Sequence, residues 1–593
     1  MDIGQSTLLT APTPELESLS FALADPESVG HWISCLPMAN IRESAGQLRQ
    51  ATFEIARLHT GWATRLSLLE GIRPTVLYLT ARLDKTAGAA GNQADAISRL
   101  SQRIQTNLCS GYCSVVLATL PEAAHSAEAK SALSLAVHRA LTDLSMTLLR
   151  TLQFYVAPAH QLWLKLNQLY HLAEQLGIEG DAYPITENNV RIELSICSTY
   201  LRSLLLAMAR PYQLRHRQLA DVYHALGRWA HLVSLSYESD SDIFVVDLAS
   251  DLGPEHVDRF AGGDTSRAIR AGRLTRSLKI WAQDLAEDSP AIPSGIDPAV
   301  ITHLADAWGE MKPRAFGRYR SSEPIKVSVG MRSTHYFLSG GTEFSDLLGA
   351  KLGTRHPEVN PFLSEDVTFV PQAGESHDVW EDAFDVNGRI PVNPQFADPD
   401  SILFTRQPKS LEQAREVYVH HDTTSADSSP GGYRLRWNEP FPSNLQTGEL
   451  IGLRYEKDSR WCLAVARWIR QDETGPYMGV ELLAPQARPI ALKLVQSRGG
   501  ANEYQRAFLL PELKPIGQPA TLLTPFAPFR SGQKVQLLNG GVQSTAQLGD
   551  CLTKTGSFNQ FTFRMLDGYL ERPERQTNMK SAKNRKNTTI GLR

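Results

Sequence analysis

Apolar residues recur at helical spacing in the first half of the chain. From Leu133 to Leu152, leucine and valine return every three or four positions, which places them on one continuous face of a helix. Residues 162–176 repeat the pattern, and Gly177 then supplies a residue type at which helices commonly end. These segments predict long amphipathic helices that each bury one face.

Further helices are expected on both sides of these two. Asn40 followed by Glu43 resembles a capping box and predicts that a helix begins at Ile41. The same periodicity predicts helices over residues 187–208 and 217–232. Helices of this length with short connections are typical of an antiparallel bundle or an α-solenoid, and the sequence leaves both arrangements open.

The pattern changes to that of strands in the second half of the chain. Residues 242–248 predict a short buried strand, and Ile325–Val329 alternates apolar and polar side chains as a half-buried strand does. Strands are expected again from residue 415 to about 510, and from 519 to 567. Residues 339–405 are irregular and carry several Gly, Pro and Asp, which is typical of a long loop or insertion.

These patterns predict an α+β chain of several domains, because 593 residues exceed what one hydrophobic core supports. We expect a flexible leader at 1–24, a mainly helical domain at 25–310, a β-barrel at 311–510 with an insertion at about 339–410, a β segment at 515–570 that has the size of a second small barrel, and a disordered basic tail at 571–593. The lysines and arginines of the tail also suit a partner-binding arm.

Charge and cysteine content narrow the classes of function. The net charge of −3 lacks the basic excess of proteins that bind nucleic-acid polymers, yet it allows a local basic site for a small anion. The six cysteines are scattered without metal-binding spacing, so we expect free thiols and no metal. The N-terminus does not resemble a signal peptide and no run of 18 apolar residues occurs, which predicts a cytoplasmic protein without a membrane span.

Two short patterns carry candidate chemistry, and the first is rich in arginine. It is Arg314-Ala-Phe-Gly-Arg318, with Arg320 close behind, just ahead of the predicted strand Ile325–Val329. A guanidinium matches phosphate oxygens with two parallel hydrogen bonds, and it matches O6 and N7 of guanine in the same way. Two arginines four positions apart therefore present two such groups to one region.

The second pattern is Asp427-Ser-Ser429-Pro-Gly-Gly432, which leads into a predicted strand. The aspartate oxygens can accept hydrogen bonds from N1–H and N2–H₂ of guanine, and Ser429 adds a hydroxyl. The glycines let the backbone turn tightly and let a ligand come close. Either pattern alone is common as a chance match or a capped turn, but together they suit an anionic ligand with guanine edges.

The order of these patterns resembles the PilZ family, whose six-stranded β-barrels bind cyclic di-GMP. Members carry RxxxR ahead of the first barrel strand and [D/N]xSxxG after the second. Here Arg314 and Arg318 precede Ile325–Val329, and Asp427 follows a strand expected around Glu416–His420. The sequence therefore carries both halves of the family motif in the family order.

The resemblance covers about residues 314–340 and 412–485, and it departs from the family in two respects, of which the smaller is Val480-Glu-Leu where a late strand typically has Val-x-Phe. The two motif halves are separated by the insertion at about 339–410, where ordinary members have a short connection. A barrel tolerates such an insertion because loop-closure entropy grows only logarithmically with loop length. Whether the inserted segment completes, covers or blocks the site stays open at this point.

By resemblance, the ligand-binding residues are Arg314, Arg318, Arg320, Asp427, Ser429 and Gly432. The arginines would clamp phosphates and guanine, the aspartate and serine would read guanine edges, and the glycine would hold the turn open. The fold implied is a helical domain, a PilZ-like six-stranded barrel split by an insertion, and a further small β-domain.

Two classes of function follow. The first is a bacterial cyclic di-GMP receptor that couples nucleotide binding to a partner-binding helical domain or to the basic tail, in control of motility or biofilm. The second is a non-enzymatic adaptor or scaffold whose barrel no longer binds nucleotide. The complete motif favours the receptor.

Catalysis is not expected. The sequence contains no G-x-S-x-G, P-loop, H-E-x-x-H or kinase signature. His420-His421-Asp422 offers imidazoles for a base or a metal site, but alternation along a strand directs two adjacent side chains to opposite faces. We therefore predict no catalytic residue, no metal and no cofactor besides the ligand cyclic di-GMP.

Overall fold

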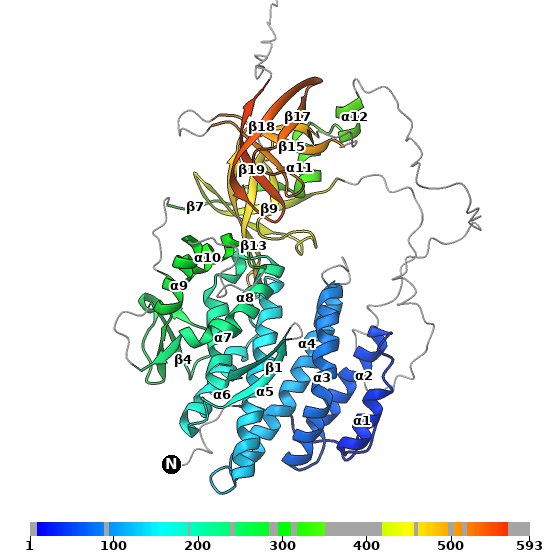
Figure 1. Cartoon of the computed structure of the whole chain (residues 1–593), viewed down its shortest axis with the longest axis vertical. Helices are drawn as coiled ribbons and strands as arrows, with labels where there is room; N and C mark the ends of the chain where they lie inside the picture. The colour runs from blue at the N-terminus through cyan, green and yellow to red at the C-terminus, as the bar shows by residue number, and fades with distance from the viewer. Residues whose placement is uncertain are drawn as a thin grey trace, which may run out of the picture. The chain divides into compact units, whose positions relative to one another are not determined.

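The chain, as a computed structural model, divides into two units. These are Met1–Thr334 with Pro357–Pro485, and His335–His356 with Gln486–Arg593. The residues that the structure describes are 9–87, 94–187, 190–237, 243–283, 295–309, 317–349, 418–455, 460–495, 503–512 and 519–566. A helical region and one barrel belong to the first unit, and a second barrel belongs to the second (Figure 1). The expected α+β class with an N-terminal helical region is confirmed.

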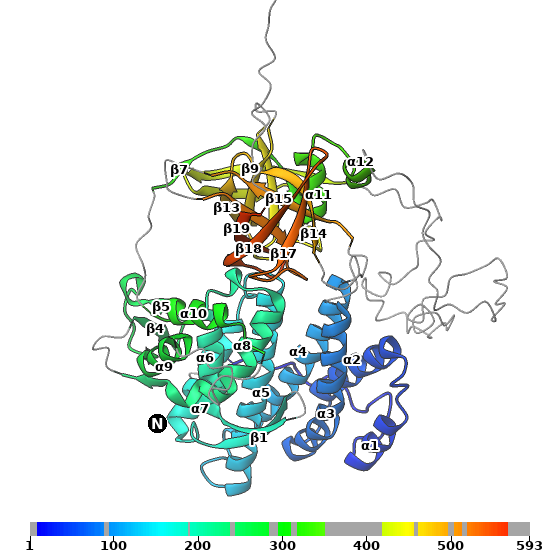
Figure 2. The ribbon, with the colours of Figure 1, turned by 45° about the horizontal axis from the view of Figure 1, so that its top comes forward.

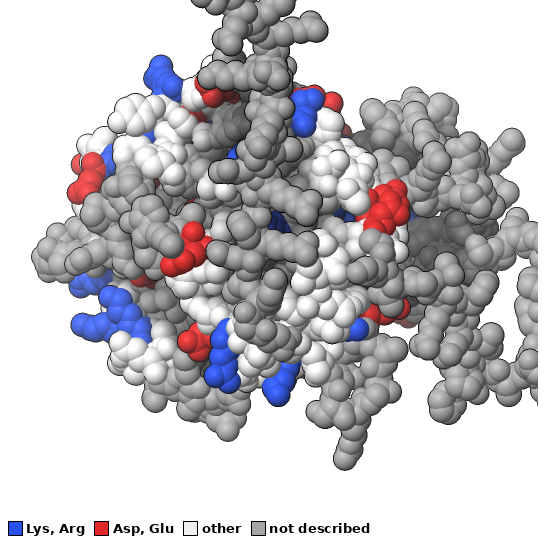
Figure 3. Space-filling view, turned by 90° about the horizontal axis from the view of Figure 1, so that it is seen from above, with Lys and Arg blue, Asp and Glu red and all other residues white. Residues whose placement is uncertain are grey.

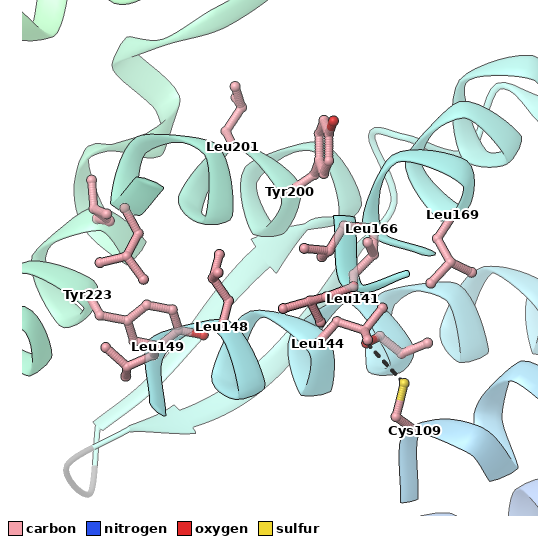
Figure 4. Close-up of a cluster of buried hydrophobic side chains, with 14 of the residues drawn as sticks. Cys109, Leu141, Leu144, Leu148, Leu149, Leu166, Leu169, Tyr200, Leu201 and Tyr223 are labelled. Carbon is pink, nitrogen blue, oxygen red and sulfur yellow. Dashed lines mark hydrogen bonds between the residues drawn. The ribbon is translucent and has the colours of Figure 1, made fainter. Parts of the chain in front are cut away.

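The helices of the first unit share one hydrophobic core. They are α1 Pro26–Ser34, α2 Ile41–Arg57, α3 Trp62–Ala87, α4 Ala94–Thr119, α5 Ala127–Gln153, α6 Leu162–Leu176, α7 Ile196–Met208, α8 His216–Trp229, α9 Gly272–Gln283 and α10 Pro298–Ala307. The long helices α3, α4 and α5 lie side by side in Figures 1 and 2. Figure 4 shows leucines of α5, such as Leu144 and Leu148, in the same buried cluster as Leu166 of α6 and Tyr200 of α7.

The helix boundaries expected from capping residues are confirmed. The Asn40 side chain accepts a hydrogen bond from the backbone N–H of Glu43 at 3.2 Å, so α2 begins at Ile41. Helix α6 ends at Gly177, whose φ of 63° lies in the left-handed region that glycine adopts without strain. These helix ends are set by the capping residues themselves, so they can be predicted from the sequence.

One predicted helix is wrong over its first part. Residues expected to begin a helix at 187 instead complete an antiparallel hairpin of β1 Ala182–Glu187 and β2 Val190–Ser195, and α7 starts only at Ile196. Leu194 is buried while Arg191 and Glu193 are exposed, which is the alternation of a strand. The alternating pattern of strand β2 is followed directly by the helical pattern of α7, and the prediction extended the helical pattern too far towards the N-terminus.

A small sheet precedes the first barrel. It contains β3 Ser234–Ser236, β4 Phe244–Asp247, β5 Glu255–His256 and β6 Ser266–Arg270 in the order β3-β6-β4-β5. Strand β4 confirms the strand expected over residues 242–248. The described residues also contain the short 3₁₀ turns η3 Pro211–Gln213, between α7 and α8, η4 Ala230–Leu232, before β3, and η5 Val257–Arg259, after β5.

The first barrel is a closed ring of six strands. Its strands are β8 Pro324–Val329, β9 His420–Ser429, β10 Gly432–Trp437, β11 Leu450–Tyr455, β12 Cys462–Asp472 and β13 Gly475–Ala484. They pair in the order β10-β13-β12-β11-β8-β9, and β9 pairs with β10 to close the ring. The short strand β7, Tyr319–Arg320, adds to β9. Inward side chains such as Val327, Leu435 and Met478 fill the barrel core.

The second barrel lies in the other unit and contains more of the chain than we predicted. Strands β14 Arg488–Leu494, β15 Gln505–Leu510, β16 Thr521–Pro525, β17 Lys534–Asn539, β18 Val542–Lys554 and β19 Phe558–Met565 close in the order β14-β15-β16-β19-β18-β17. Figure 2 shows β17, β18 and β19 side by side. Strands β14 and β15 were expected in the first barrel, up to residue 510, because the sequence shows alternation but not which sheet a strand joins.

Two short helices lie at the start of the segment expected to be an insertion. These are α11 Gly330–Leu338 and α12 Phe344–Gly349. Helix α12 falls within residues 339–405, which we expected to be irregular. The rest of that expected insertion, from residue 350 to about 410, lies outside the described residues, as do residues 411–417. Among the helices described, none has the length and apolar character needed to cross a membrane.

A buried ion pair ties the β1–β2 hairpin to the helices. Arg202 on α7 donates two hydrogen bonds to the Glu187 carboxylate, at 2.6 and 2.8 Å, and His224 lies 2.9 Å from the same carboxylate. Burial would raise the pKa of Glu187, but the Arg202 charge and the hydrogen bonds from His224 and Arg202 outweigh it and lower the pKa to about 2.

Replacing Glu187 should destabilise the helical region. In Glu187→Gln the buried Arg202 loses its counter-charge, so we expect the free energy of unfolding at pH 7 to fall by about 3 kcal/mol, measured by urea denaturation. Because the folded-state pKa is lowered, the wild-type advantage is present above the ordinary glutamate pKa and shrinks as the pH falls from about 4.5 towards 2. The exposed Glu193→Gln on the same hairpin is the control, and an equal loss in both variants would contradict this account.

Candidate ligand-binding site

The hairpin of β9 and β10 carries the acid–glycine half of the motif. Ser429 pairs with Gly432 across the two-residue turn, and the Ser429 hydroxyl donates to the Gly432 carbonyl at 3.3 Å. Asp427 and Ser429 lie within β9, whereas we expected them after a strand that ends near residue 420. The expected strand around 416–420 is described only from residue 418, and β9 continues through the motif.

Gly432 is required by packing. A Cβ atom at this position would lie 2.0 Å from the Val480 carbonyl oxygen, because β10 and β13 approach closely there. The structure gives Gly432 no left-handed φ, so the expected role of holding the turn open is replaced by close contact between strands. Gly432 thus fixes the position of the hairpin that presents Asp427.

The two motif halves meet in the folded chain. Arg318 Nη1 lies 2.7 Å from Asp427 Oδ1, although the two residues are separated by 109 positions. The Arg318 side chain is 39% exposed and that of Asp427 is 19% exposed. The pair is therefore in reach of solvent, and a ligand can reach both groups at once.

Two more arginines stand beside the aspartate. Arg320 on β7 is the cross-strand partner of Asp427 on one side, and Arg434 on β10 is its partner on the other. Cross-strand partners project on the same face of a sheet, so these three side chains form a row. Leu435, the neighbour of Arg434, belongs to the barrel core, so the row lies on the outer face of the barrel.

Arg434 was not among the predicted site residues. Its guanidinium carbon lies 4.3 Å from the centre of the Tyr477 ring, and its buried Nε has no hydrogen-bond partner among the described residues. The signal in the sequence was available: Arg434 is two positions after Gly432, where strand alternation returns to the face of the motif. Of the predicted residues, Arg314 lies outside the described part of the chain.

The adjacent histidines are separated as alternation predicts. His421 packs against Trp437 with ring centres 5.1 Å apart, and burial lowers its pKa below the usual value. His420 is exposed, with Nε2 3.4 Å from Lys326 Nζ. No group of three His, Cys, Asp or Glu side chains that could hold a metal ion occurs in the described residues.

The positive charge at the candidate site is a local feature and does not reflect the charge of the whole chain. The whole chain has 60 Lys and Arg against 63 Asp and Glu. Both signs are intermixed among the coloured side chains on the face shown in Figure 3. At the site, three arginines surround one aspartate, and this arrangement leaves a local positive excess suited to an anion.

Comparison with known proteins covers each part of the chain. Family models match in three parts: "Cyclic-di-GMP receptor FimW, N-terminal domain" at residues 27–240, "Cyclic-di-GMP receptor FimW, middle PilZ domain" at 243–489, and "FimW C-terminal beta-barrel domain" at 490–566. The cyclic-di-GMP receptor FimW of Pseudomonas aeruginosa is 32% identical over 581 residues, which is 94% of this chain and 93% of the relative. No solved structure matches the chain. The resemblance to PilZ domains is confirmed.

The Gly432 contact gives a direct test of how the hairpin is held. In Gly432→Ala the methyl group meets backbone that cannot rotate away, so we expect the barrel to lose about 3 kcal/mol of stability in urea denaturation. Gly317→Ala is the matched control, because a Cβ there meets nothing within 4 Å. Equal stability of the two variants would show that β10 and β13 do not approach as described.

Proposed function

This chain belongs to the FimW family of cyclic-di-GMP receptors, and we propose that it binds cyclic di-GMP on the outer face of its first barrel, around Arg318 and Asp427. The observation that carries the proposal is the 2.7 Å contact between these two side chains. A guanidinium and a carboxylate at this spacing can engage a phosphate or a guanine edge of the same small molecule.

The chemistry of the ligand matches the residues present. Cyclic di-GMP carries two phosphates and two guanines. Arg318, Arg320 and Arg434 supply planar donors for phosphate oxygens and for O6 and N7 of guanine. Asp427 supplies acceptors for N1–H and the N2 amino group, and we assign the Ser429 hydroxyl to the same edge. By resemblance Arg314 joins the phosphate clamp.

Binding requires an exchange of partners. Without ligand, Arg318 and Asp427 neutralise each other, which avoids leaving either charge unpaired. The ligand replaces this one interaction with several, so each group moves from a protein partner to a nucleotide partner. We propose that this exchange is the event the receptor transmits to its helical region and, from there, to a protein partner that acts in motility or biofilm formation.

The receptor function belongs in the bacterial cytoplasm, where a diffusible nucleotide messenger is available to it. A protein partner contacted through the helical region or the basic tail is part of this proposal, and the tail at 571–593 lies outside the described residues. We assign no catalytic role to the site. The competing adaptor function differs from the receptor in one property, which is the absence of nucleotide binding.

Calorimetric titration with cyclic di-GMP tests the site. We expect binding by the intact chain and a Kd raised roughly tenfold or more in both Arg318→Ala and Asp427→Ala, because each removes hydrogen bonds to a charged group. Arg564→Ala is the control, since Arg564 is exposed on β19 of the second barrel, where it donates hydrogen bonds to Gln547. Absence of heat from the intact chain would favour the adaptor, and equal binding by all variants would place the ligand elsewhere.

Discrimination between bases tests the role of Asp427 in particular. Adenine has an acceptor at N1 and lacks the N2 amino group, so cyclic di-AMP should bind the intact chain roughly 100-fold more weakly than cyclic di-GMP. In Asp427→Ala the two ligands should differ much less, because the group that selects guanine is gone. The same preference in both proteins would mean that Asp427 does not read the base.

A further inference from the structure

A row of side chains connects the candidate site to the helical region across the outer face of the barrel. We call it the outer row, and its members are Asp427 on β9, Arg434 on β10, Tyr477 on β13, Arg470 on β12 and Tyr212 on η3. The first four lie on strands of the barrel, and Tyr212 belongs to the helical region. All five belong to the same unit of the chain.

Each member of the outer row touches or directly faces the next. Asp427 and Arg434 are cross-strand partners, and the Arg434 guanidinium stacks on Tyr477 at 4.3 Å. Tyr477 is the cross-strand partner of Arg470, whose guanidinium carbon lies 5.5 Å from the Tyr212 ring centre. The neighbours Leu435, Met478 and Ile469 fill the barrel core, so alternation directs the row outward. The contacts follow one another without a gap.

At its far end the row reaches a junction built from backbone hydrogen bonds. The Ala157 N–H donates to the Gln471 carbonyl at 2.8 Å, and the Gln471 N–H donates to the Tyr155 carbonyl at 2.7 Å. Gln471 is the chain neighbour of Arg470, and the Tyr212 hydroxyl donates to the Val156 carbonyl at 3.2 Å. The last two members of the row therefore hold both sides of this junction.

The junction is strained and tightly held. Tyr155 has a φ of 58°, which a non-glycine residue adopts only when its surroundings impose it. Its buried hydroxyl lies 3.3 Å from the Thr447 hydroxyl and accepts from the Thr447 N–H at 3.2 Å, and Arg215 donates to the Thr447 carbonyl at 2.8 Å. A strained backbone that persists only while these contacts hold it is suited to exist in two arrangements.

We infer that the outer row is the route by which a ligand at Asp427 loosens the junction between Tyr155 and Gln471. The inference rests on the proposed function, and it adds the residues that carry the signal and its direction. Arg434 is the responding group: its guanidinium rests on Tyr477, and its Nε has no hydrogen-bond partner among the described residues. A dianionic ligand beside Asp427 attracts Arg434 away from that ring.

The consequences pass along the row in order. When the Arg434 guanidinium leaves the Tyr477 ring, the Tyr477 side chain loses the contact that holds it in place. Arg470, the cross-strand partner of Tyr477, then loses a fixed neighbour on the outer face of the barrel. Arg470 also pairs with Asp472 at 3.2 Å, so it has an alternative to Tyr212. When Arg470 leaves Tyr212, the junction loses a side-chain contact and the strained backbone at Tyr155 can relax.

Hydrogen exchange measures the junction directly. Peptides that contain the amides of Ala157 and Gln471 should exchange about fivefold faster when the full chain is saturated with cyclic di-GMP. In Arg470→Ala the contact with Tyr212 is already lost, so these amides should exchange fast without ligand, the ligand should add no further effect, and the Kd should fall by up to about fivefold. Arg467→Ala, which alters an arginine on the same strand outside the row, should keep the full effect.

Reciprocity supplies a second measurement. If the ligand loosens the junction, loosening the junction must tighten ligand binding by the same factor. Tyr155→Phe removes the hydroxyl that holds Thr447, so it should lower the Kd for cyclic di-GMP by about fivefold. An unchanged or raised Kd in this variant would contradict the inferred direction.

The outcomes separate this inference from the proposed function. Absence of binding by the intact chain would overturn both. Binding without any change in the Ala157 and Gln471 amides would overturn the outer row alone and leave the receptor function standing. An effect that survives in Arg470→Ala would show that the signal takes another route.

Discussion

The pairing of β9 with strands on both of its sides is the constraint on which this molecule depends. Strand β9 joins β8 and β7 along one edge and β10 along the other, and its pairing with β10 closes the first barrel. Because β7 follows Arg318 in the chain and β9 contains Asp427, the pairing of β7 with the other edge of β9 brings the two halves of the motif into contact. Strand β9 therefore takes part both in closing the barrel and in assembling the candidate site, although a long segment separates it from β7 in the sequence.

The sequence was informative where local chemistry decides the structure. The N-cap at Asn40, the stop at Gly177 and the spacing of leucines on α5 each depend on neighbours a few positions away. The order of the two motif halves, read with the strands around them, was enough to indicate a PilZ-type barrel. These features need no knowledge of the tertiary fold.

The sequence was uninformative where partners are distant. Nothing local shows that β14 and β15 pair with β17 and β16, so the end of the first barrel was placed too late in the chain. The prediction that the motif needs Gly432 was correct, but glycine is needed there because the strand lies so close to the Val480 carbonyl on another strand. Strand alternation after Gly432 indicates the face on which Arg434 lies, but its register with Asp427 and its stacking on Tyr477 depend on other strands.

We propose that cyclic di-GMP binds where Arg318 and Asp427 contact each other. An experimentally determined structure of the full chain with cyclic di-GMP tests it most directly. We expect the ligand to lie against β7, β9 and β10, Arg318 and Asp427 to have exchanged each other for phosphate and guanine, and Arg434 to have left the face of Tyr477. A bound ligand elsewhere on the chain, with the Arg318–Asp427 pair intact, would contradict it.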